Sequence, residues 1–232
     1  MLGQGSVNGI DALGRFSPAQ YGEGTRERIR HSYGIPTDAL VLGFVGRIVC
    51  DKGLRELIQA WRGLRERFPL LHLLPVGIFE PQDPLPPADE ALLRSDPRVH
   101  LAGWRTDIPE HLTAMDLFAN PSYREGFGVA NLEASAMGLP VVATTIPGCV
   151  DSVQNGITGT LVPPREALAL EETLAAYLLD PSLRRKHGQA GRARVLAHFR
   201  PETLSREVEG MYRGLAKRKE SPPPTPVTPC QS

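Results

Sequence analysis

Short segments that are apolar throughout recur along this chain, and helical segments separate them. Residues 41–47 and 71–78 are two such segments, each with the length of a buried strand. Between them, apolar side chains recur three and four residues apart over 54–68, which predicts an amphipathic helix that ends before Pro69. Strands that are apolar on both faces are typical of parallel sheets with helices on each side. The pattern therefore predicts an α/β domain built on a doubly wound, Rossmann-like parallel sheet.

The same alternation continues toward the C-terminus. From residue 165 to residue 219 the pattern is helical, with breaks near Pro181 and Pro201. A proline-rich stretch at 81–87 predicts a surface loop. The remaining expected elements are strands at 99–102, 116–120, 141–144 and 159–162, and helices at 26–33, 107–114 and 129–137.

Composition divides the chain into three parts. Residues 1–39 are rich in turn formers and end in a short lead-in helix, and residues 40–220 form the predicted α/β domain with its C-terminal helices. Residues 221–232, SPPPTPVTPCQS, are too poor in apolar side chains to form a core, so we expect a disordered tail. A length of 232 residues fits one domain with extensions.

Charge and cysteine content argue against several classes of function. The 26 basic and 26 acidic residues balance, so no strong attraction to nucleic acid is expected. Cys50, Cys149 and Cys230 are far apart, which predicts neither a disulfide framework nor a zinc site. No apolar run approaches the roughly 18 residues of a transmembrane helix, and residues 1–16 lack the charged and apolar blocks of a signal peptide. We therefore expect a cytoplasmic protein without a transmembrane segment.

Common signatures of other α/β enzymes are missing from the sequence. It contains no G-x-G-x-x-G after a strand, no G-x-x-x-x-G-K-[ST] and no G-x-S-x-G. An Asp-x-Asp pair is also missing, which weakens any prediction of a metal-bound diphosphate. We therefore expect no metal ligands.

One candidate anion site follows the first strand. Gly46 and Arg47 end that strand, and Lys52 and Gly53 open the next helix. The N-terminus of a helix favours an anion, and two cations would neutralise a phosphate there. An ordinary turn with solvated charges is the alternative.

Two further loops follow strands and would reach the same edge of the sheet. Residues 124–128, REGFG, carry Glu125 and two glycines that let backbone N–H groups approach a ligand. Glu133 lies on the helix that follows, although acids near helix N-termini are common for dipole reasons alone. The loop at 147–152 either closes the site from the other side or simply returns the chain.

Four stretches together resemble the family 4 glycosyltransferases, which are retaining enzymes of the two-domain GT-B fold. The segment E-G-F-G with a second glutamate after seven intervening residues is specific when it follows a G-R and D-K-G block. The resemblance extends from about Ser6 to Lys219. It rests on GSVNGID at 5–11, FVGRIVCDKG at 44–53, PSYREGFGVANLEASAMGLPVVAT at 121–144 and GCVDSVQNGITGTLVPP at 148–164.

The resemblance implies a role for each matching position. Arg47 and Lys52 are similar to the pair that grips the leaving diphosphate, and Glu133 is similar to the acid that binds the ribose hydroxyls. A nucleotide-diphosphate sugar would be the co-substrate, with no other cofactor and no metal. Glu125 would join Arg47 and Lys52 as catalytic residues, and the donor-binding positions would be Gly126, Phe127, Gly128, Leu132 and Glu133.

The implied reaction is transfer of a sugar, expected to be UDP-linked, to a glycan or polyprenyl-linked acceptor with retention. The resemblance is to the branch that builds bacterial surface polysaccharides, so the protein could also lie peripherally at the inner face of the membrane. The chain corresponds to one half of a GT-B enzyme, with 1–39 as an interdomain-type segment. We expect the N-terminal acceptor domain to be missing through truncation or to be a separate chain, and this half to be inactive alone.

Two alternatives remain open from the sequence. A non-catalytic nucleotide-sugar-binding module would have the same binding residues, and a sugar-nucleotide epimerase would share the fold.

In complete relatives the last helix crosses to the other domain. We therefore expect an exposed apolar face on that helix, formed by Leu204, Val208, Met211 and Leu215.

Overall fold

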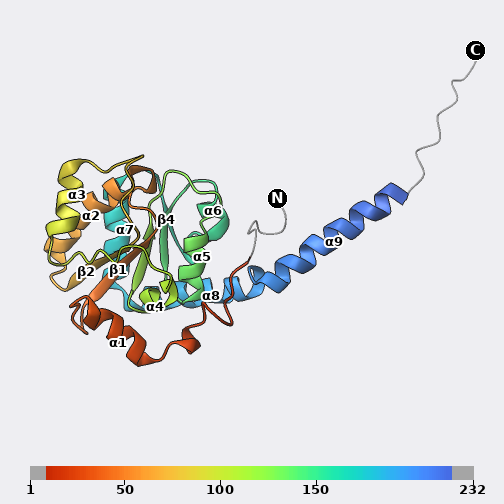
Figure 1. Ribbon diagram of the computed structural model, residues 1–232, viewed down its shortest axis with the longest axis horizontal. Helices are drawn as coiled ribbons and strands as arrows, with labels where there is room; N and C mark the ends of the chain where they lie inside the picture. The colour runs from red at the N-terminus through yellow and green to blue at the C-terminus, as the bar shows by residue number, and fades with distance from the viewer. Residues whose placement is uncertain (1–8, 221–232) are drawn as a thin grey trace, which may run out of the picture.

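Five parallel strands form the centre of the computed structural model, which describes residues 9–220. The order across the sheet is β2-β1-β3-β4-β5, so the chain starts near the middle and winds outward in both directions (Figure 1). This confirms the predicted doubly wound, parallel α/β fold. The strands are β1 (Leu40–Val45), β2 (Leu71–Val76), β3 (Leu117–Asn120), β4 (Val141–Thr144) and β5 (Gly159–Val162).

Two hydrophobic cores cover the two faces of this sheet, because alternate strand residues point to opposite sides. Val41 belongs to one core and Leu42 to the other, and both side chains are fully buried. The core beside Leu42 is covered by α2 (Leu54–Arg67), α3 (Pro87–Ser95) and α7 (Ala167–Leu179). The core beside Val41 is covered by α1 (Glu23–Ser32), α4 (Ile108–Thr113), α5 (Val129–Ala136) and α8 (Pro181–His198).

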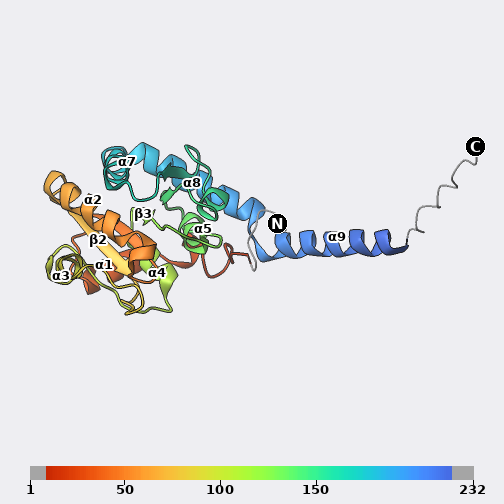
Figure 2. The ribbon, with the colours of Figure 1, turned by 90° about the horizontal axis from the view of Figure 1, so that it is seen from above.

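A few short elements complete the described chain. The 3-10 turn η1 (Pro18–Gln20) precedes α1, and the turn η2 (Cys50–Lys52) precedes α2. The loop expected at 147–152 holds one helical turn, α6 (Cys149–Ser152). Helix α9 (Pro201–Glu220) extends away from the rest of the domain in both ribbon views (Figure 2).

The prediction of a strand at 99–102 is wrong, and Pro75 explains why. Residues 98–102 run beside β2, where the backbone N–H groups of His100 and Ala102 donate to the carbonyls of Leu73 and Pro75. Pro75 has no N–H to donate in return, so the ladder is interrupted and only isolated bridges remain. Helix α3 was not predicted from the sequence, because the prolines before it indicated a loop.

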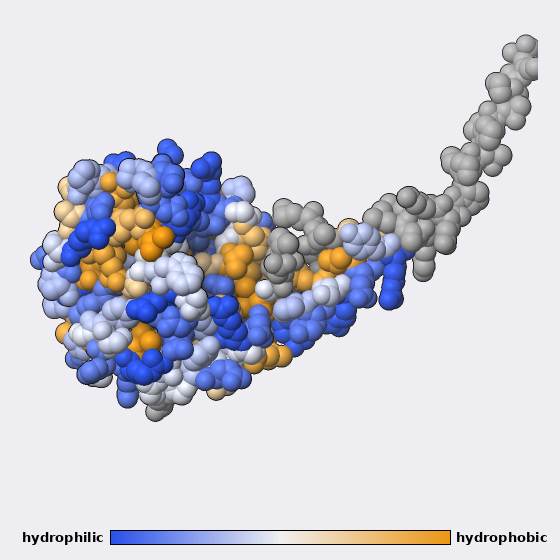
Figure 3. Space-filling model, viewed as in Figure 1, coloured by the Kyte–Doolittle hydropathy of each residue, from blue (hydrophilic) through white to orange (hydrophobic). Residues whose placement is uncertain are grey.

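The expected apolar face of α9 is only partly exposed. Leu204 is buried against the domain, contrary to the prediction, whereas Met211 is 40% exposed and Val208 lies between these extremes. Hydrophobic surface is visible both on the domain body and along this helix (Figure 3). The side chain of Leu215, the tail at 221–232 and the start of the GSVNGID segment lie outside the described part of the structure.

Candidate functional site

The loops after β1, β3 and β4 meet at the carboxyl edge of the sheet, where ligands of open α/β folds bind. The loop after β1 contains Gly53 with φ +69°, and a Cβ there would lie 2.0 Å from the carbonyl oxygen of Pro121. Glycine is therefore required for the first two loops to approach so closely. The backbone N–H of Tyr123 also donates to the carbonyl of Asp51 at 2.9 Å, which joins these loops.

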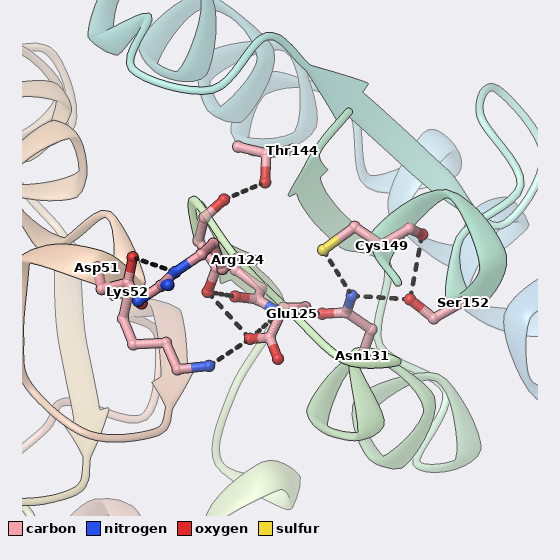
Figure 4. Close-up of polar contacts among 10 residues, drawn as sticks. Asp51, Lys52, Arg124, Glu125, Asn131, Thr144, Cys149 and Ser152 are labelled. Carbon is pink, nitrogen blue, oxygen red and sulfur yellow. Dashed lines mark hydrogen bonds and ion pairs between the residues drawn. The ribbon is translucent and has the colours of Figure 1, made fainter. Parts of the chain in front are cut away.

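A lysine–glutamate ion pair forms where these two loops touch. Lys52 Nζ lies 2.6 Å from Glu125 Oε1, and the two side chains are 18% and 16% exposed (Figure 4). The sequence predicted both residues as site residues, and the structure brings them into direct contact. Because the pair is largely removed from water, its charges act more strongly than those of a surface pair.

Buried polar side chains form hydrogen bonds with the Glu125 carboxylate. Ser122 Oγ donates to Glu125 Oε1 at 3.0 Å, and Asn120 Nδ2 lies 3.4 Å from the same oxygen. Asn120 also donates to Asn131 Oδ1 at 2.9 Å, which connects β3 to α5. Within the described residues, every hydrogen bond recorded for this carboxylate is to Oε1. Oε2 is therefore the oxygen left to accept from a ligand.

The glycine loop after Glu125 packs tightly against the loop after β4. Gly128 has φ +64°, and a Cβ there would lie 2.7 Å from both Asn131 Nδ2 and Ser152 Oγ. Gly148 approaches equally closely, since its Cβ would lie 2.6 Å from the carbonyl oxygen of Glu125. Asn131 Nδ2 donates to Ser152 Oγ at 3.0 Å (Figure 4). The two loops thus form one rigid wall at the N-terminus of α5.

Arg47 lies on the same loop as Lys52 but contacts a different carboxylate. Its Nη1 donates to Glu80 Oε2 at 2.8 Å, and the two side chains are 54% and 27% exposed. Exposed pairs of this kind contribute little to stability. Arg47 can therefore exchange this partner for a phosphate group.

A pocket of about 390 Å³ opens beside Arg47, at the ends of β1 and β2. Its walls are largely apolar, and the indole of Trp104 is 72% exposed there. Flat aromatic groups stack on such side chains. The other lining residues include Val45, Gly77, Ile78 and Ile108.

Three predicted donor-binding positions lie on or next to α5 in different environments. The side chains of Phe127 and Leu132 are 8% and 0% exposed and belong to the core, so contacts from these positions come from the backbone. Glu133 is half-buried, and desolvation raises its pKa to about 7, while Arg15 partly opposes this shift. This carboxylate therefore changes its protonation near neutral pH.

Sequence reasoning missed the polar residues that support Glu125. Asn120 and Asn131 are both buried polar side chains, next to apolar core positions. The available signal was an asparagine at the end of an apolar strand, since buried polar groups need partners. Trp104 was also missed, because a single aromatic residue in a loop belongs to no sequence pattern that would indicate a binding site.

The described residues contain no group of three or more His, Cys, Asp or Glu side chains that could hold a metal ion. Over the same residues, no helix has the length and apolar character needed to cross a membrane.

Comparison with known proteins establishes the family. The profile of the family described as Glycosyl transferases group 1 matches residues 25–194, which is more than half of the chain. This chain belongs to the group 1 glycosyltransferases. The predicted relation to glycosyltransferases of the GT-B fold is confirmed.

A curated relative and two solved structures illustrate this relation. The capsular polysaccharide biosynthesis glycosyltransferase CapM of Staphylococcus aureus is 34% identical over 220 residues, covering 95% of this chain and 56% of CapM. Anabaena Alr3699/HepE in complex with UDP has a TM-score of 0.79 at 25% identity, covering 89% of this chain and 56% of that one. The C-terminal domain of LpcC, a glycosyl transferase group 1 family protein from Francisella tularensis, has a TM-score of 0.68 at 24% identity.

This group 1 glycosyltransferase chain matches only part of the length of its longer relatives. It spans about half the length of CapM and of HepE. The LpcC match covers 82% of this chain and 97% of that C-terminal domain. The fold is thus the Rossmann-like C-terminal domain of a GT-B glycosyltransferase.

Proposed function

We propose that this chain is the donor-binding half of a retaining glycosyltransferase of family 4 that uses a UDP-linked sugar. The observation that carries the proposal is the Lys52–Glu125 pair, held at the strand ends beside a glycine loop. A cation at this position stabilises the negative charge that develops on a leaving diphosphate, and a carboxylate accepts hydrogen bonds from sugar hydroxyls. The UDP and UDP-glucose complexes of HepE support the nature of the donor.

The base and the diphosphate have separate positions in this proposal. The base enters the 390 Å³ pocket and packs on Trp104. The diphosphate then lies between Arg47, which lines that pocket, and Lys52 on the same loop. Arg47 gives up its exposed contact with Glu80 in exchange for a charge-assisted phosphate contact.

The sugar and the ribose are recognised around the N-terminus of α5. The free Oε2 of Glu125 accepts from the donor sugar, and backbone N–H groups at Gly126, Phe127 and Gly128 face it. The carboxylate of Glu133 accepts from ribose hydroxyls, and the backbone of Leu132 lies beside it. Burial of Glu133 makes its hydrogen bonds stronger than those of an exposed acid.

Charge stabilisation by side chains replaces a metal ion in the proposed reaction. The bond between the anomeric carbon and the diphosphate oxygen breaks, and the electron pair leaves with the diphosphate. Arg47 and Lys52 stabilise that negative charge, and the acceptor oxygen forms the new bond on the same face of the sugar while its proton passes to the leaving diphosphate. A chelator should therefore leave UDP affinity unchanged.

The acceptor side requires a second domain. We propose that an acceptor-binding domain, in the same or another chain, completes the cleft, in line with relatives about twice as long. A glycan or polyprenyl-linked acceptor for surface polysaccharide, used at the inner face of the cytoplasmic membrane, agrees with the name of CapM.

Calorimetry with UDP tests the donor site. Arg47→Ala and Lys52→Ala should each weaken UDP binding by about 1.5–3 kcal/mol, because each removes a charge-assisted contact. Arg67→Ala, an equally exposed arginine at the end of α2, is the matched control and should bind as the parent does. Equal UDP affinity in all four proteins would contradict the assignment.

A product assay separates the proposed transferase from its alternatives. Labelled UDP-sugar is incubated with a polyprenyl-linked acceptor and this chain, with and without a family acceptor domain supplied in trans. A transferase gives glycosylated lipid when the acceptor domain is present. Binding without product would indicate a non-catalytic module, and interconversion of free UDP-sugars without acceptor would indicate an epimerase.

A further inference from the structure

A row of buried amide and hydroxyl groups runs behind the Glu125 carboxylate and continues into the loop after β4. Asn120, Asn131 and Ser152 are all buried, so their polar atoms depend on one another for partners. Asn131 lies at the centre of the row. Its Oδ1 accepts from Asn120 Nδ2 at 2.9 Å, and its Nδ2 donates to Ser152 Oγ at 3.0 Å (Figure 4).

The direction of these hydrogen bonds is fixed from the far end of the row. Ser152 donates its hydroxyl proton to the carbonyl oxygen of Cys149 at 3.1 Å, so its Oγ accepts from Asn131. The amide of Asn131 therefore turns its nitrogen toward Ser152 and its oxygen toward Asn120. Asn120 in turn faces Asn131 with its Nδ2, which also lies 3.4 Å from Glu125 Oε1 and has a second N–H for that oxygen.

The hydroxyl of Ser122 makes the contribution of Asn120 necessary. Its single proton has two acceptors, Asn120 Oδ1 at 2.6 Å and Glu125 Oε1 at 3.0 Å, and the amide oxygen is the closer one. Asn120 Nδ2 therefore supplies a neutral donor that the carboxylate would otherwise have to share. A reversed Asn120 amide would instead turn its oxygen toward the carboxylate, and the two oxygens would repel each other.

We propose that Asn131 is a positioning residue for the donor sugar, which acts through Asn120 on Glu125. This inference rests on the proposed function, in which Glu125 Oε2 accepts from that sugar. Lys52, Ser122 and Asn120 all direct their donors at Oε1. The carboxylate cannot rotate without losing these hydrogen bonds, so Oε2 keeps one direction.

A positioning role and a purely structural role of Asn131 affect different quantities. Asn131 also lies against the glycine loop, since a Cβ on Gly128 would lie 2.7 Å from its Nδ2. General loosening of that loop would weaken UDP and UDP-sugar binding together. An effect through Glu125 instead changes the contact with the sugar, which UDP lacks. The affinity for UDP-glucose divided by the affinity for UDP therefore separates the two roles.

Calorimetry with UDP-glucose and UDP on the full chain measures this ratio. Glu125→Gln should lower the ratio about tenfold, because the sugar loses a charged acceptor. Asn131→Ala should lower it about fivefold, because the carboxylate stays charged but is no longer held in one direction. When both substitutions are combined, the ratio should equal that of Glu125→Gln alone, since Asn131 acts through the Glu125 carboxylate.

Tyr177→Phe is the matched control for a loss of stability. Tyr177 is buried in the core on the other face of the sheet from α5, and its hydroxyl pairs with Thr160 and His187. Tyr177→Phe and Asn131→Ala should both melt below the parent, because each removes a buried hydrogen-bonding group. Only Asn131→Ala should change the ratio.

A second variant covers the case in which Asn131→Ala does not fold. Ser152→Ala removes the acceptor that fixes the amide of Asn131, one hydrogen bond further from Glu125. It should lower the ratio in the same direction, by about twofold.

The outcomes distinguish this inference from the proposed function. A normal ratio in Asn131→Ala and Ser152→Ala, with a reduced ratio in Glu125→Gln, would overturn the inference and leave the proposed function intact. A further fall in the combined variant would also overturn it, because Asn131 would then act by a route other than Glu125. A normal ratio in Glu125→Gln would contradict the contact between Glu125 and the sugar, and the inference with it.

Discussion

Replacement of Lys52 by alanine should reduce both stability and UDP affinity, and the structure gives the size of each effect. Lys52 Nζ lies 2.6 Å from Glu125 Oε1, with 18% and 16% of these side chains exposed. Breaking a fully buried pair costs about 3–5 kcal/mol, whereas exposed pairs contribute about 0–1 kcal/mol. A pair at this level of burial falls between these limits, so we expect the free energy of unfolding to fall by about 2 kcal/mol.

The arginine on the same loop provides the matched comparison. Arg47→Ala breaks only an exposed pair with Glu80, so the free energy of unfolding should change by less than about 1 kcal/mol. Both variants should nevertheless lose about 1.5–3 kcal/mol of UDP binding energy. Urea denaturation measures the first quantity, and calorimetry at a temperature where each variant is folded measures the second.

A double substitution tests the electrostatic reasoning itself. In Lys52→Ala, the unpaired Glu125 carboxylate both destabilises the fold and repels the diphosphate. Removing that charge as well, in Lys52→Ala with Glu125→Gln, should recover about half of the lost stability, about 1 kcal/mol, since Ser122 and Asn120 can still bond to the amide oxygen. The reasoning fails if the double variant is less stable than Lys52→Ala, or if Lys52→Ala unfolds at the same urea concentration as the parent.

Further predictions address other parts of the structure. Gly53→Ala should cost at least about 2 kcal/mol of stability in urea denaturation, since its Cβ would clash with Pro121, and a smaller cost would contradict the loop geometry. Burial and the neighbouring His72 lower the pKa of His100 to about 4 in the folded protein, so the unfolded chain binds this proton more tightly. As the pH falls from 7 to 5, the stability of the parent relative to His100→Gln should therefore decrease by about 2 kcal/mol. Desolvation raises the pKa of Glu133 from 4.5 to about 7, so this residue costs stability that accumulates as the pH rises through that range. At pH 8, Glu133→Gln should therefore be more stable than the parent by up to about 3 kcal/mol while losing UDP affinity, and equal stability of the two proteins at pH 8 would refute the burial argument. Product assays should detect little transfer by this chain alone, because orienting two substrates supplies about 7–11 kcal/mol, and full-rate transfer would overturn the half-enzyme proposal.

Elements with a strong local pattern were predictable from the sequence. Strands β4 and β5 have the predicted bounds, and α2 begins at Leu54 as its spacing indicates. Helix α3 was missed although Pro87 starts it and acidic residues occupy its first turn, because the preceding prolines favoured a loop. The strand expected at 99–102 failed through Pro75 on a neighbouring strand, which no local pattern reveals.

Contacts within the site depend on residues that are distant in the sequence. Lys52 and Glu125 were both expected at the site, but 73 positions separate them, and only the fold shows that they form an ion pair. The same holds for the contact of Asn131 with Ser152, which fixes the glycine loop. Sequence patterns indicate which loops reach the edge of a parallel sheet, whereas side-chain pairing depends on how closely those loops approach.

The unfavourable features of this domain gather at one edge of the sheet, which supports a function there. Glu133 is buried enough to resist ionisation, and Arg165 has a strained backbone. Each is a local cost that folding alone would not select, since a glutamine in place of Glu133 or a glycine in place of Arg165 would suit the fold better. The Lys52–Glu125 pair lies at the same edge, where a diphosphate and sugar hydroxyls would use both of its charges. Stability and UDP affinity should therefore change in opposite directions for Glu133→Gln, and together for Lys52→Ala.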